Sequence, residues 1–367
     1  MSSIAGHLVR RGTELASAHF KDPEKKPEQI SGALAAGLAL TVLIFSFAMW
    51  AVEYTYGQVV ATLAAVEASN PDVYVRIDNP PEEDPTKPFD PNEPEHAALA
   101  PSPQPVTSKL RTTIRHLRAR AGFWSRFRGL SMYLSYGLAR GIISGFMPLP
   151  AGSFISQFFV QSIVSVLLAT WQMAWVHIVI SEPSPKRFYQ RIPSFRTWIK
   201  IAPAAALEDI LTAAAFFFPM AIASFAGWIE FDDSNESSMV VMCRYLMVMG
   251  FPALLAFVVS IPARVIFIRV AASMLPEEDE TIVPFDRSFG GKVQPQIVGG
   301  SGHIGLLDAW TTFDWAARVR FAKVMGKTIA IEVALGLLAG ILLFVQIFTM
   351  APNAVRQGDG SAKPSTA

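Results

Sequence analysis

Apolar residues in this chain run in long, nearly uninterrupted segments that few polar residues break. A helix needs about 20 consecutive apolar residues to cross a hydrocarbon layer of about 30 Å, so segments of that length predict membrane spans. Five segments reach it, namely 32–52, 154–181, 204–229, 239–275 and 328–350. The pattern therefore predicts an all-α fold, a polytopic bundle of transmembrane helices.

A sixth segment, 130–147, is shorter and carries Arg140 near its middle. It ends at the sequence MPLPAGS, whose proline and glycine residues favour a tight turn into the segment 154–181. We interpret these two segments as a helical hairpin, which raises the expected number of spans to about six. If 130–147 lies only at the membrane interface, five spans remain.

The connecting segments differ sharply in charge. Residues 182–203 hold five basic side chains and one acid, whereas residues 230–238 hold four acids and no base. Short basic loops stay on the cytosolic side of a membrane, so these two loops are expected on opposite sides. With six spans, both ends of the chain then face away from the basic loop.

The connection after the first span has two halves of opposite character. Residues 71–105 contain ten prolines and eight acids against two bases, a composition that predicts an extended, disordered loop. Residues 109–128 contain seven bases and no acid, and apolar residues recur at helical spacing from Leu110 to Ala121. The second half predicts a basic amphipathic helix in the headgroup layer, where it attracts anionic lipid. A plain positive-inside anchor is the alternative.

We therefore expect six regions along the chain. They are a polar N-terminal segment (1–30), a first transmembrane helix (31–59), a disordered proline-rich acidic loop (60–108), the basic amphipathic helix (109–128), a helical membrane domain (129–350) and a disordered tail (351–367).

Arginines near two membrane boundaries are expected to reach lipid headgroups. The segment 239–275 is longer than a bilayer requires, and arginines near its end can extend toward the interface. The expected headgroup-contacting residues are Arg111, Arg115, Arg118, Arg120, Arg126, Arg128, Arg264 and Arg269. The acids at 277–280 follow directly, and we expect them to form ion pairs with Lys186, Arg187 and Arg191 of the basic loop.

Polar side chains inside the spans are the candidates for function, because a charge in hydrocarbon costs free energy unless it is paired or reaches water. The candidates are Arg140, Glu208, Asp209, Gln157, Gln161, Gln172, His177 and Glu332. We expect Arg140 to pair with Asp209 or Glu208. We expect the three glutamines to form a polar stripe along one continuous helix. The stripe supports either a path for a solute or proton, or hydrogen bonds that hold the helices together.

Composition supports a membrane protein and disfavours most catalytic classes. Of the 367 residues, 51% are hydrophobic and 17% are charged, against about 25% charged residues in soluble domains. The net charge of +1 gives no field that favours nucleic acid. The six histidines lack the paired spacing of a zinc site, and the GxGxxG pattern at 300–305 lacks the preceding strand of a dinucleotide site. The sequence predicts no catalytic residue, metal, cofactor or nucleic-acid partner.

Two stretches, SEPSPKRFYQRIPSFRTW and RVAASMLPEEDETIVPFDRSFGGK, resemble a family of filamentous-fungal multipass membrane proteins of unestablished activity. The resemblance covers the general pattern of the last two thirds of the chain and implies a multipass fold. Two functions remain open. The first is a non-enzymatic organiser or adaptor that engages anionic lipid, partner proteins or a second copy of the chain. The second is a small-solute transporter or channel. We expect an endomembrane or the plasma membrane rather than the mitochondrial inner membrane.

Overall fold

The structure is a computed structural model that describes residues 32–68, 105–147, 153–229, 238–294 and 299–359. Within these ranges the chain is helical, apart from turns and one isolated bridge between Ser181 and Thr281. The predicted all-α membrane bundle is confirmed. The N-terminal segment and most of the acidic loop lie outside the described residues.

The chain divides into two compact units, which we describe separately. Residues 1–50 and 332–367 form one, which we call the hairpin unit. Residues 51–331 form the other, which we call the bundle unit.

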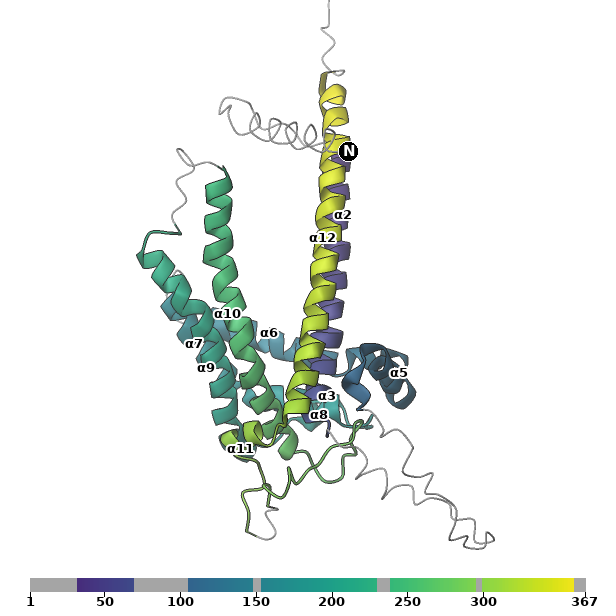
Figure 1. Ribbon diagram of the computed structural model, residues 1–367, viewed down its shortest axis with the longest axis vertical. Helices are drawn as coiled ribbons and strands as arrows, with labels where there is room; N and C mark the ends of the chain where they lie inside the picture. The colour runs from purple at the N-terminus through teal and green to yellow at the C-terminus, as the bar shows by residue number, and fades with distance from the viewer. Residues whose placement is uncertain (1–31, 69–104, 148–152, 230–237, 295–298, 360–367) are drawn as a thin grey trace, which may run out of the picture. The chain divides into compact units, whose positions relative to one another are not determined.

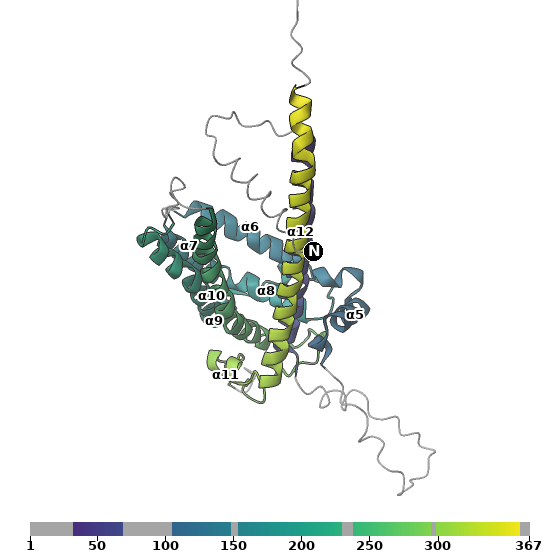
Figure 2. The same cartoon turned by 45° about the horizontal axis from the view of Figure 1, so that its top comes forward.

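The hairpin unit is built from most of α2 (Gly32–Val52) and the second half of α12 (Trp315–Asp359). These helices lie side by side and run in opposite directions, as Figures 1 and 2 both show. Gln346 Nε2 donates a hydrogen bond of 2.7 Å to Thr41 Oγ1 and so joins them. Because α12 continues to Asp359, the prediction of a disordered tail from residue 351 is wrong for its first part.

Apolar side chains cover the outer surfaces of the hairpin unit. Phe47 is 63% exposed and Phe344 is 65% exposed, and leucines and isoleucines lie exposed around them. An apolar surface of this extent is unstable in water. Lipid therefore covers these helices.

The first helix continues well beyond its predicted end. It passes from α2 through a π-helical turn, η1 (Glu53–Val60), into α3 (Ala61–Val66), whose residues are all buried. The prediction that the acidic loop begins at residue 60 is therefore wrong. The reason is that 60–66 reads VATLAAV, an apolar sequence that the core of the bundle unit takes up.

Two long helices form the frame of the bundle unit. α9 (Phe195–Phe225) and α10 (Ser238–Ser273) pack along each other, and α7 (Phe154–Leu167) packs against α9. α8 (Ala169–Ile180) contacts both long helices and α6 (Leu130–Phe146), as Figure 2 shows.

Among the residues that the structure describes, four helices are long and apolar enough to cross a membrane, and the bent pair α7–α8 makes a fifth if it counts as one span. The four are Leu34–Val66, Phe195–Phe225, Met239–Ser273 and Trp315–Thr349. The expected number of six is therefore too high. The helix α6 has 17 residues and a length of about 26 Å, which is shorter than the hydrocarbon layer of about 30 Å.

The segment that holds α6, α7 and α8 begins and ends at the same place. The Arg128 guanidinium, just before α6, donates to the Ile178 carbonyl at 2.9 Å and also to the Ser181 carbonyl, at the end of α8. The chain bends by 59° between α7 and α8. These contacts favour a hairpin that enters the membrane and returns to the side it came from.

Polar connections gather at one end of the bundle unit. The Ile282 N–H donates to the Ile180 carbonyl at 2.9 Å, and the Ala68 N–H donates to the Pro284 carbonyl at 2.9 Å. Ile282 itself is buried, so the segment after α10 closes over the helix ends and extends the core. The short helix α11 (Leu306–Thr311) then leads toward α12.

The predicted ion pairs between the basic loop and the acids after α10 are present for two of the three bases. Arg191 lies 3.0 Å from Asp279, and Lys186 lies 2.7 Å from Glu278. The main chain joins the same segments, since the Glu182 N–H donates to the Glu280 carbonyl at 2.8 Å.

The predicted basic helix is α5 (Leu110–Ala121), followed by a 3₁₀ turn, η4 (Phe123–Phe127). Its apolar face does not face a headgroup layer as expected. Leu117 is fully buried in the core of the bundle unit, and Ile114 packs against that core. The helix is amphipathic because the protein's own core uses its apolar face.

Candidate functional site

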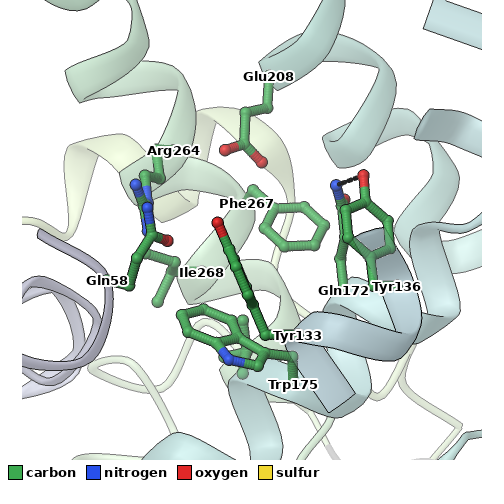
Figure 3. A pocket seen from close by; sticks show the side chains of 10 residues that line it. Gln58, Tyr133, Tyr136, Gln172, Trp175, Glu208, Arg264, Phe267 and Ile268 are labelled. Atoms are coloured by element: carbon green, nitrogen blue, oxygen red, sulfur yellow. Dashed lines mark hydrogen bonds between the residues drawn. The ribbon is translucent and has the colours of Figure 1, made fainter. Parts of the chain in front are cut away.

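A cavity of about 140 Å³ lies inside the bundle unit, bounded by η1, α6, α8, α9 and α10. Most of its wall is aromatic or aliphatic, and a few polar groups converge on it. The lining residues are Gln58, Tyr133, Tyr136, Gln172, Trp175, Val176, Glu208, Arg264, Phe267 and Ile268. Figure 3 shows the Glu208 carboxylate and the Arg264 side chain entering from different helices, with Gln58 beside Arg264.

The π-helical turn η1 positions Gln58. Gln58 Nε2 donates to Glu53 Oε1 at 3.0 Å, five residues earlier, and Gln58 Oε1 accepts a hydrogen bond from Arg264. A Cβ at Gly57 would lie 2.5 Å from Glu53 Oε2, so glycine leaves the room that the folded-back carboxylate needs. π-Helical turns inside α-helices occur frequently at functional sites.

Glu208 is the acidic group of the cavity. Within the described part of the chain, its carboxylate makes neither a hydrogen bond nor an ion pair, although Arg264 lines the same cavity. Tyr133 likewise has no hydrogen bond to its hydroxyl among the described residues, and Figure 3 shows that hydroxyl pointing into the cavity. The Glu208 carboxylate and the Tyr133 hydroxyl therefore face the cavity with unused hydrogen-bonding capacity.

A hydrogen-bonded network flanks the cavity. Gln172 Nε2 donates to the Tyr136 hydroxyl at 2.6 Å, and Arg140 donates to the same hydroxyl at 3.4 Å. Arg140 Nη2 lies 3.9 Å from Asp209 Oδ1, so the expected pair of Arg140 with one of the two acids of α9 is present. The network connects α6, α8 and α9 beside the cavity.

The expected polar stripe is not one continuous helical face. Gln157 and Gln161 lie on α7, whereas Gln172 lies on α8, beyond the bend of 59°. The helix ends at Leu167 and restarts at Ala169, so the helical-wheel relation does not hold across this break. Gln161 instead approaches Asp209, and Gln172 faces the cavity.

Two other candidates lie away from the cavity. His177 Nε2 lies 2.8 Å from the Ala271 carbonyl, and the ring is buried between α8 and α10. Glu332 belongs to the hairpin unit. Neither residue lines the cavity, and we assign His177 a role in helix packing.

Arg264 and Arg269 are not headgroup anchors, contrary to the expectation. Arg264 lines the cavity and donates to Gln58. Arg269 is 7% exposed and donates to the carbonyls of Ala309 and Ala65 at 2.9 and 3.1 Å. The segment after α10 folds back over the helix end, so protein rather than lipid surrounds Arg269.

The expectation that Arg128 contacts lipid headgroups is also wrong. Its guanidinium donates to the carbonyls of Ile178 and Ser181, which have no further helical turn to bond. Burial lowers the pKa of Arg128 to about 10, and the positive charge of Arg191 acts in the same direction. Arg128 therefore closes the end of α8 instead of meeting lipid.

The remaining expected arginines form a basic surface on α5 and η4. Arg111, Arg115, Arg118 and Arg120 are exposed, and Arg126 is partly exposed. Arg120 pairs with Glu182, and the guanidinium of Arg118 lies 5.0 Å from the ring centre of Phe123. Phe123 is 62% exposed and Trp124 is 73% exposed. This surface combines exposed positive charge with exposed aromatic rings.

Sequence reasoning missed the cavity residues Gln58, Tyr133, Tyr136 and Trp175. A signal was available for Gln58, because it follows the single acid Glu53 within an apolar run that continues to residue 66. The tyrosines and the tryptophan carried none, since aromatic residues are common in membrane helices.

Comparison with family models, with curated proteins and with solved structures finds no match for this chain. Among the described residues, no group of three histidine, cysteine, aspartate or glutamate side chains is placed to hold a metal ion. The function must therefore be inferred from the geometry.

Proposed function

We propose that this chain is an integral membrane protein that binds a small polar solute in the cavity of the bundle unit, in the manner of a transporter. The observation that supports this proposal is Glu208, whose carboxylate faces the cavity with no ion pair among the described residues. A charge inside an apolar bundle costs free energy unless another group compensates it. A bound polar solute supplies that compensation.

Hydrogen bonding between helices explains the flanking network but not Glu208. Gln172 on α8 donates to the Tyr136 hydroxyl on α6, and Arg140 on α6 donates to the same hydroxyl, so these contacts form without a ligand. Polar contacts of this kind commonly hold membrane helices together. The Glu208 carboxylate and the Tyr133 hydroxyl are outside that network.

The size of the cavity limits the solute. A volume of about 140 Å³ exceeds the roughly 30 Å³ that one water molecule occupies in the liquid. A solute of a few non-hydrogen atoms therefore fits. The solute class is therefore small and polar.

The test measures the thermal stability of the purified full-length protein with a panel of small polar solutes, because a ligand that binds the folded state raises the melting temperature. We expect at least one solute to stabilise the unaltered protein and to leave Glu208→Gln unaffected. Glu332→Gln is the matched control, since it removes another carboxylate from a membrane helix outside the cavity, and it should respond like the unaltered protein. A panel that shifts no melting temperature, or shifts both variants equally, would refute the proposal.

A second candidate function rests on a separate observation. We propose that the basic surface of α5 and η4 binds anionic lipid, which supports the role of membrane organiser or adaptor. The exposed arginines provide charge complementarity, and Trp124 and Phe123 are the aromatic residues that favour the headgroup region. The cytosolic leaflet of an endomembrane or of the plasma membrane supplies such lipid.

This second proposal is tested with full-length protein in nanodiscs that contain or lack phosphatidylserine. Brominated lipid should quench the fluorescence of Trp124, obtained as the difference from Trp124→Phe, and more strongly when phosphatidylserine is present. Replacing Arg111 and Arg115 by glutamine should reduce that dependence. Equal quenching in neutral nanodiscs would support a plain positive-inside anchor instead.

A further inference from the structure

The charges that line the cavity point to a particular class of solute. Glu208 on α9 and Arg264 on α10 carry opposite charges, and both face the cavity without forming an ion pair with each other. If the only role of these two side chains were to neutralise each other, they would form an ion pair. The arrangement leaves a separate anionic and a separate cationic wall around one small space (Figure 3).

Arg264 keeps hydrogen-bonding capacity for a ligand. A guanidinium has five N–H donors, and the hydrogen bond that Arg264 donates to Gln58 Oε1 uses one amino group. Gln58 is itself held by Glu53, which fixes the position of the acceptor. The other donors of Arg264 have no acceptor among the described residues. A carboxylate is the group that matches them best.

The side of the cavity at Glu208 suits a small ammonium group. The Glu208 carboxylate accepts hydrogen bonds from such a group, and the Tyr133 hydroxyl points into the same space (Figure 3). The rings of Trp175 and Phe267 complete the wall, and aromatic faces attract cations. One carboxylate and one guanidinium line the cavity, so an occupant of no net charge leaves neither of them uncompensated.

We infer that the cavity binds a small zwitterion, with an ammonium group at Glu208 and a carboxylate at Arg264. The inference rests on the proposed solute-binding function and names its substrate class. The volume of about 140 Å³ admits an amino acid of the size of glycine or alanine. The second ion pair nearby, Arg140 with Asp209, is neutral as a pair and does not alter this balance.

The test is equilibrium binding of radiolabelled glycine, acetate, methylammonium and acetamide to full-length protein in nanodiscs. Glycine carries both charges, acetate only the negative charge and methylammonium only the positive charge, and acetamide is neutral. We expect glycine to bind roughly 30-fold more tightly than the other three, because each of them leaves a buried charge unpaired.

The variants give a crossed pattern that misfolding cannot produce. Glu208→Gln should weaken glycine binding roughly 30-fold and should now prefer acetate to methylammonium, because only Arg264 remains charged. Arg264→Gln should prefer methylammonium to acetate. If Arg264→Gln does not fold, Arg264→Lys keeps the charge and should keep the preference for glycine. Glu332→Gln should bind like the unaltered protein.

The outcomes separate the inference from the function on which it rests. If acetate, methylammonium or acetamide binds as tightly as glycine, the zwitterion is wrong and solute binding stands. If no probe binds although the solute panel stabilises the unaltered protein and not Glu208→Gln, the inference again fails alone. If neither experiment shows a ligand, both are wrong.

Discussion

Arg140 Nη2 on the short helix α6 lies 3.9 Å from Asp209 Oδ1 on the membrane-spanning helix α9. The Asp209 side chain is 11% exposed and that of Arg140 is 31% exposed, so the contact is largely removed from water. It connects a helix too short to span the bilayer to one that does span it. The pair therefore helps to hold the α6–α8 hairpin in the bundle.

Replacing one residue of this pair should lower the free energy of unfolding more than replacing both. Asp209→Leu leaves the arginine without its counter-ion, and we expect a loss of about 2–4 kcal/mol in the free energy of unfolding. Arg140→Leu should cost a similar amount, and the double variant should recover most of the loss. Unfolding in SDS micelles measures all three. Additive losses in the double variant would show that the charges do not stabilise each other.

Glu67 should hold together the two parts of the chain that flank residues 69–104. The Glu67 carboxylate accepts hydrogen bonds from the main-chain N–H groups of Val106 and Thr107. Arg320 Nη2 donates to the main-chain carbonyl of Glu67 at 2.7 Å. Glu67→Gln removes the charge from these bonds and should cost about 2 kcal/mol of unfolding free energy. Chemical unfolding in micelles measures it.

Replacing residues 70–103 should give the contrasting result. The sequence predicts disorder for residues 71–105, and Glu67 already holds Val106, so a short glycine–serine linker in their place should leave the free energy of unfolding within about 1 kcal/mol. A shortened protein that fails to fold would show that the loop has a structural role.

The two ion pairs between the basic loop and the acids after α10 should contribute unequally. The side chains of Arg191 and Asp279 are 7% and 12% exposed, so Asp279→Asn should destabilise the protein by about 2 kcal/mol. The pair of Lys186 and Glu278 lies in water, and Lys186→Gln should leave the melting temperature unchanged. The Glu278 hydrogen bond raises the pKa of Lys186, yet the exposed pair is screened. Equal effects of the two substitutions would contradict this difference.

Arg269 should not tolerate replacement by lysine. Its guanidinium donates to Ala309, Ala65 and Thr312, and the rings of Phe289 and Phe313 lie 4.8 and 5.2 Å from it. An ammonium group cannot reproduce the planar fork, so Arg269→Lys should cost about 2–3 kcal/mol. Thermal unfolding of purified protein measures it. A neutral effect would indicate that Arg269 reaches lipid, as the sequence alone suggested.

Cysteine labelling tests whether the α6–α8 hairpin returns to its own side. In a Cys243→Ser background, Ala119→Cys on α5 and Ser184→Cys after α8 should react with an impermeant maleimide from the same side of sealed vesicles. The ion pair of Arg120 with Glu182 holds these positions together. Ser224→Cys, at the far end of α9, should react from the other side. Labelling of Ala119→Cys and Ser184→Cys from opposite sides would require an odd number of crossings between them.

The sequence predicted well where apolar length alone decides the structure. The apolar segments 32–52 and 239–275 match α2 and α10 closely, whereas α9 and α12 begin 9 and 13 residues before the predicted segments 204–229 and 328–350. Charge also predicted a pairing between two distant loops, as Arg191 with Asp279 shows. The pair of Arg140 and Asp209 could be expected because each lay in an apolar segment and needed a counter-charge.

Predictions failed where a side chain's surroundings come from distant parts of the chain. Arg269 and Arg128 had the flanking sequence of interface anchors, but the segment after α10 and the end of α8 cover them. The polar stripe failed because the chain bends between α7 and α8, where no proline or glycine marks a break.

The sequence by itself determined the class of this protein, its long spans and the sign of its loops, because hydrophobic length and charge act locally on the choice between lipid and water. Only the tertiary structure decided which polar groups share one cavity. Glu208, Arg264 and Gln58 come from three helices far apart along the chain. Their convergence depends on how those helices pack, since the cost of a buried charge is set by what surrounds it in space and not by its neighbours in sequence.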